Sequence, residues 1–166
     1  LPPNAARLIT ELNTMGFTRL GETYTKVWLI GGGVTWLLVS PDKTVVAEVI
    51  DIGGHMPTGV QFGTAFMDDA SLETSYPFGE NQDFDRFRAR FNTESLAAAY
   101  QQHLTERATM QAEHGTPRIF SNMPQYQDWD VRYRELHVYK RLGRPALPSI
   151  LMSIWFLVLL GLFGFM

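Results

Sequence analysis

The spacing of hydrophobic residues changes along this chain, and each change predicts a different element. Near the N-terminus, apolar residues three or four positions apart predict a helix that Asn4 caps and that runs through Met15, with Gly16 as its stop. Similar spacing predicts a second helix from about Thr93 to His114, and a third from roughly Gln125 to Leu142.

Between the first two helices, short segments rich in β-branched and aromatic residues predict strands. The predicted strands are Thr23 to Ile30, Val34 to Ser40, Thr44 to Asp51, Val60 to Asp68 and Ser71 to Phe78. The turns expected between them include Gly31-Gly32-Gly33, Pro41-Asp42-Lys43 and Asp69-Ala70. Because such short connections leave no room for crossover helices, neighbouring strands are expected to pair antiparallel.

The C-terminal part of the chain has a different pattern, since no charged residue occurs from Pro145 to Met166. A helix that Pro148 opens and that continues to Met166 would be roughly 27 Å long, against a hydrocarbon thickness of about 30 Å. A buried core helix is the alternative, but the only polar side chains after Pro148 are Ser149 and Ser153. The pattern therefore favours a transmembrane helix.

The predicted fold class is α+β: an N-terminal helix, an antiparallel sheet of about five strands, a long helix packed on the sheet, and one C-terminal transmembrane helix. The expected organisation is a soluble domain over residues 1–122, a juxtamembrane helical segment over 123–144 and the transmembrane helix over 145–166.

Basic residues indicate how the chain is oriented in the membrane. Lys140, Arg141 and Arg144 stand before the apolar segment, and no positive charge follows it. The positive-inside bias therefore predicts a cytoplasmic N-terminal domain and a C-terminus on the opposite side. Within the predicted span, the positions expected to contact neighbouring helices or lipid are Ser149, Ser153, Trp155 and Gly161.

Composition excludes several kinds of chemistry. The net charge is −3, from 14 basic and 17 acidic residues, so no general basic field favours nucleic acid as a partner. The chain has no cysteine, which excludes disulfides, thiolate nucleophiles and cysteine-ligated metal centres. The predicted span has no histidine to serve as an axial ligand for haem or chlorophyll, and no cofactor is expected.

Other candidate sites are better explained as structural features. The triple glycine at residues 31–33 fits neither dinucleotide-binding nor P-loop spacing. His103 and His114 lie eleven residues apart on one predicted helix, about 16 Å along its axis, too far to share a metal ion. Asp68, Asp69 and Glu73 could be paired carboxylates, but turn chemistry accounts for them better. We therefore expect no catalytic, cofactor-binding or metal-binding residue.

Two segments are candidates for contact with a partner or with lipid. If Asp83 to Phe91 forms a strand, then Arg86, Arg88 and Arg90 line one side of it. The other side is lined by Phe87, Ala89 and Phe91. An ordinary solvated face is one interpretation of this basic row, and docking on an acidic subunit or anionic lipid is the other. In the juxtamembrane segment, Trp129 and Tyr133 join apolar rings to polar tips, as interfacial residues do.

The function expected from these features is that of a non-catalytic accessory or assembly subunit of a larger membrane protein complex, with other membrane subunits and the bilayer as partners. A photosynthetic or respiratory complex is the class that we would test first. The alternative is a membrane-tethered domain that binds a small molecule, or an enzyme, with a pocket between sheet and helix.

Overall fold

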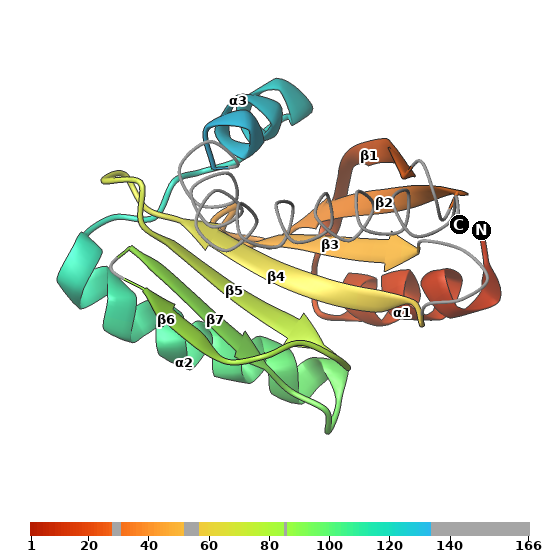
Figure 1. Cartoon of the computed structure of the whole chain (residues 1–166), viewed down its shortest axis with the longest axis horizontal. Helices are drawn as coiled ribbons and strands as arrows, with labels where there is room; N and C mark the ends of the chain where they lie inside the picture. Colours follow the sequence, from red (N-terminus) through yellow and green to blue (C-terminus); the bar gives the residue numbers. More distant parts are fainter. Residues whose placement is uncertain (28–30, 52–56, 85, 134–166) are drawn as a thin grey trace, which may run out of the picture. The chain divides into compact units, whose positions relative to one another are not determined.

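The structure is a computed structural model that describes residues 1–27, 31–51, 57–84 and 86–133 (Figure 1). The chain falls into two compact units, Leu1–Tyr126 and Gln127–Met166, and each is described by itself. The first unit holds a sheet with helices and belongs to the predicted α+β class.

The described strands form a seven-stranded sheet in the order β1-β2-β3-β4-β5-β7-β6. The strands are β1 (Thr18–Val27), β2 (Gly31–Val39), β3 (Val46–Asp51), β4 (Gly59–Ala65), β5 (Ser71–Tyr76), β6 (Gln82–Phe84) and β7 (Phe87–Phe91). Strands β1 to β5 form the antiparallel meander that the sequence predicted. Strand β7 then pairs parallel to β5, and β6 pairs antiparallel to β7 at the end of the sheet.

Two features of the sheet differ from the sequence prediction. The sheet has seven described strands where about five were expected, because residues 82–91 add β6 and β7. The triple glycine is not a turn: it begins β2 and pairs with residues 25–27 of β1. The other two predicted turns are confirmed by left-handed backbone at Lys43 (φ 58°) and Asp69 (φ 71°).

The three helices are α1 (Pro3–Thr14), α2 (Leu96–His114) and α3 (Met123–Tyr133). Helix α1 begins two residues earlier than predicted, because Pro2 is the N-cap and Pro3 takes the first helical position, where a missing N–H costs nothing. Gly16 ends it as expected, at φ 88°, and lies so close to Pro41 that an added Cβ would be 2.9 Å from the Pro41 ring. Ser95 caps α2 by accepting a hydrogen bond from the Ala98 N–H at 3.0 Å.

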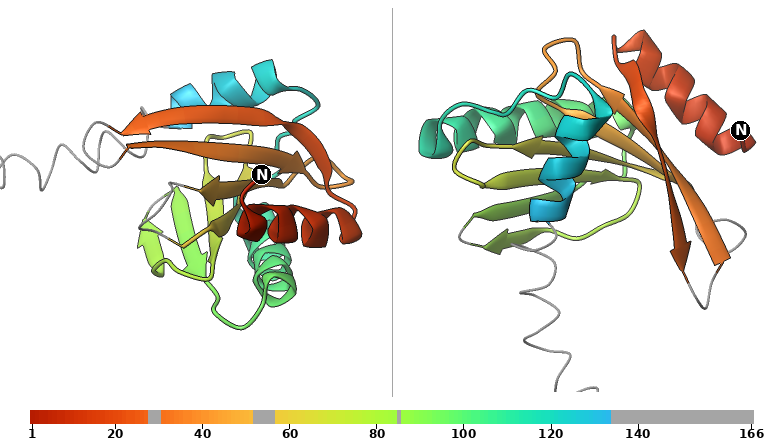
Figure 2. Two further views of the ribbon diagram at one scale, coloured as in Figure 1. Left: turned by 90° about the vertical axis from the view of Figure 1, so that its right-hand side faces the viewer. Right: turned by 90° about the horizontal axis from the view of Figure 1, so that it is seen from above.

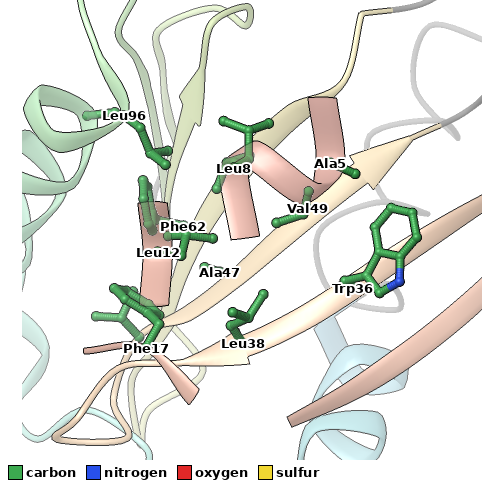
Figure 3. Packing of buried hydrophobic residues seen from close by; sticks show 13 residues of the cluster. Ala5, Leu8, Leu12, Phe17, Trp36, Leu38, Ala47, Val49, Phe62 and Leu96 are labelled. Carbon is green, nitrogen blue, oxygen red and sulfur yellow. The ribbon is translucent and has the colours of Figure 1, made fainter. Parts of the chain in front are cut away.

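The main hydrophobic core lies between the sheet and the two long helices, which cover the same face of it (Figures 1 and 2). Figure 3 shows Leu8 and Leu12 of α1 against Ala47 and Val49 of β3, with Phe62 of β4 beside them. Because successive strand residues point to opposite faces, every second residue of these strands reaches this core. A second cluster, of Phe66, Ala70, Leu72 and Met110, extends the core beneath the C-terminal half of α2.

The opposite face of β1 to β3 is covered by the segment that follows α2. The Phe120 N–H donates to the Lys43 carbonyl at 2.9 Å, and the Tyr126 hydroxyl donates to Glu48 Oε1 at 2.6 Å. Met123 lies against Gly21, where an added Cβ would be 2.5 Å from the Met123 side chain. Residues 117–126 therefore belong to the first compact unit, which ends at Tyr126.

The predicted transmembrane helix, residues 145–166, lies outside the described residues, as does the part of the third predicted helix beyond Tyr133. Among the helices that the structure describes, none combines the length and the apolar composition needed to cross a bilayer.

Candidate functional site

Arg88 and Arg90 lie on the face of β7 that α2 covers. Arg88 contacts Glu106 of α2 at 3.2 Å and Glu113 at 3.7 Å, while Arg90 contacts the other oxygen of Glu106 at 3.2 Å. Asp83 of β6 contacts both guanidinium groups, at 3.4 Å from Arg88 and 2.9 Å from Arg90. Burial works to lower the pKa of Arg90, but Asp83 and Glu106 outweigh it and raise that pKa.

This arrangement corrects the expected geometry of the basic row. The sequence predicted an outer row on an edge strand, whereas β7 lies between β5 and β6, and only 22% of the Arg88 side chain and 16% of the Arg90 side chain are exposed. The register explains the difference, because Arg88 and Arg90 pair with Leu72 and Thr74 of β5 and share their face. The two arginines therefore link the β6–β7 hairpin to α2 through ion pairs. A role in partner contact stays a prediction.

Arg86 differs from the other two arginines. It is exposed and donates through Nη1 to the backbone carbonyl of Asp68 at 2.6 Å. The side chain thus bridges the start of β7 to the β4–β5 turn, and its place at the surface is compatible with the predicted contact role.

His103 is the only charged or titratable side chain in the buried polar set of the described residues. Its Nε2 lies 2.9 Å from Thr64 Oγ1 of β4, and its Nδ1 lies 3.0 Å from Thr74 Oγ1 of β5. Burial, and secondarily the positive charge of Arg107, lower the pKa of His103 to about 3. The imidazole is therefore neutral at physiological pH, with one nitrogen donating and the other accepting.

A second histidine, His114, is the last residue of α2 and contacts the β4–β5 turn. His114 Nδ1 lies 3.0 Å from Asp68 Oδ2, and Asp68 Oδ1 accepts the Ala70 N–H at 3.1 Å. Arg118 donates to Asp69 Oδ1 at 3.0 Å and to the Phe66 carbonyl. The two aspartates thus organise the β4–β5 turn, as the sequence predicted, and His114 also has a specific partner there, which the sequence did not indicate.

Asp42 organises the turn between β2 and β3 in a similar way, by accepting hydrogen bonds from Ser40 and Thr44. Partial burial works to raise the pKa of Asp42, but hydrogen bonds from Ser40, Thr44 and Arg107 outweigh it and lower the pKa to about 2. Arg107 Nη1 lies 2.9 Å from Asp42 Oδ2, which ties this turn to the middle of α2. The carboxylate is therefore an anchor for α2.

In the second unit, Trp129 and Tyr133 lie on one side of α3, as their spacing predicted. Their ring centroids are 5.1 Å apart with an interplanar angle of 34°, an arrangement typical of aromatic pairs one helical turn apart. The pair presents two amphipathic rings together, which is compatible with the predicted membrane or partner contact.

The remaining predicted contact residues lie outside the described part of the chain. They are Lys140, Arg141, Arg144, Ser149, Ser153, Trp155 and Gly161. Their roles stay predictions.

The structure also shows exposed aromatic residues that the sequence prediction did not single out. Phe78 is 42% exposed and Phe91 is 37% exposed. Both lie at the end of the sheet where β5 and β7 finish. Gly79, which follows Phe78, lies close to Phe91, since an added Cβ at Gly79 would be 3.2 Å from the Phe91 side chain. Alternation along residues 87–91 could have placed Phe91 on the side away from the arginines. Only the pairing of β7 with β5 shows which strand lies next to Phe91.

Among residues 1–27, 31–51, 57–84 and 86–133, no group of three or more histidine or carboxylate side chains is arranged to hold a metal ion. No family model, curated protein or solved structure matches the chain.

Proposed function

We propose that this protein is a membrane-anchored, non-catalytic accessory or assembly subunit of a larger membrane protein complex. The main support for the proposal is that the potentially reactive side chains of the described domain contact other side chains of the same domain. His103 is enclosed between two threonines, His114 is held by Asp68, and the partly buried Arg88 and Arg90 share Glu106. These groups hold the fold together, so they are poorly placed to act on a substrate.

The interface between sheet and helix argues against the alternative, a ligand pocket at that place. Phe62, Leu72, Leu96 and Met110 are almost completely buried there, together with His103. Side chains of this size fill the layer between α2 and the sheet, as the close packing of protein interiors requires. A small molecule could enter only by displacing them.

Anchoring is the second part of the proposal and comes from the sequence. The uncharged segment 145–166 supplies a span, and the cations at residues 140, 141 and 144 supply an orientation. A domain with a filled core and a single span contributes contact surface and location. A bioenergetic complex, photosynthetic or respiratory, is the first class of assembly to examine.

Gentle detergent extraction from native membranes, followed by size separation and mass spectrometry, tests this proposal. The full chain is expected in a high-mass fraction with the same companion proteins in repeated preparations. A variant without residues 149–166 should lose these companions while its domain stays folded. Recovery of the intact chain as a free monomer under the same conditions would contradict the accessory role and favour a tethered enzyme or binding domain.

A further inference from the structure

We draw no further inference here: the strongest candidate, the edge of the described sheet along β1 with the exposed side chains of Glu22 and Tyr24, carries no proposal because nothing in the structure shows what covers it.

Discussion

Helix α2 is joined to the sheet by a hydrogen bond between His103 Nε2 and Thr64 Oγ1, at 2.9 Å, in a fully buried environment. The second ring nitrogen of His103 meets Thr74 in the neighbouring strand. One side chain of α2 thus satisfies two hydroxyl groups of two strands. A buried polar group of this kind fixes the rotation of the helix on the sheet as well as its position.

The first prediction concerns how the free energy of unfolding depends on pH. The pKa of His103 is about 3 in the folded protein, against an ordinary value of 6.5, so the unfolded chain binds more protons between these values. Stability contributed by the neutral His103 is complete above pH 6.5 and falls as the pH drops toward 3, by at most about 1.4 kcal/mol per pH unit. Chemical unfolding of the full chain at several pH values between 7 and 4.5 measures this slope.

Replacement of His103 by glutamine is the control for that slope. Glutamine keeps hydrogen-bonding groups but does not titrate, so His103→Gln should lower stability at pH 7 and flatten the dependence between pH 6.5 and 4.5. Asp42 does not confuse the result, because its pKa falls from 3.8 to about 2 and its contribution is lost only in that lower range. An unchanged slope in the variant would contradict the role assigned to His103.

The second prediction concerns Glu106, which Arg88 and Arg90 share. Glu106→Ala removes the carboxylate that both partly buried guanidinium groups share, and should lower the free energy of unfolding by about 1–3 kcal/mol. Glu11→Ala is the matched control, because Glu11 pairs with Arg7 one helical turn away on an exposed surface. That change should cost less than about 0.5 kcal/mol. Equal costs in urea titrations would show that the arginine network contributes little.

The fold could be predicted wherever local pattern decides it. Strands β1 to β5 follow alternation and turn residues, and α1 and α2 follow helical spacing and their glycine stops. Strand β6 could not be predicted, since three residues carry no measurable period. The insertion of β7 between β5 and β6 depends on a pairing between distant residues, which no local pattern encodes.

The candidate site was less predictable for the same physical reason. Arg88 and Arg90 lie on one side of β7, as alternation requires, but which side faces α2 depends on the register with β5. His103 fitted the helical spacing, whereas its two threonine partners lie 39 and 29 residues away in sequence. The triple glycine was expected in a turn because glycine favours turns, yet pairing with β1 extends β2 through it.

The third prediction concerns the aromatic pair of α3. If Trp129 and Tyr133 contact a membrane or a juxtamembrane surface, the double change Trp129→Ala and Tyr133→Ala should release this segment. Trypsin cleavage after Arg132 should then become several-fold faster in proteoliposomes, because α3 opens more often. Val131→Ala is the control, since Val131 is 59% exposed and lies between the two aromatic positions. Unfolding of the domain in the double variant would instead assign the two rings to the core.

The last prediction concerns the orientation of the chain in the membrane, for which Lys140, Arg141 and Arg144 provide the argument. Positively charged residues next to a span are retained on the cytoplasmic side, so the domain should be cytoplasmic. Protease added to sealed vesicles should therefore digest the domain only when the cytoplasmic face is outward.

A charge-reversal variant tests the same orientation. Changing the three cations to glutamine and adding three lysines after Met166 should reverse the orientation of part of the protein population, because the charge bias then favours the opposite orientation. A luminal marker protein that stays intact confirms that the vesicles are sealed. Digestion of the unaltered chain only from the other face would show that these three residues do not set its orientation.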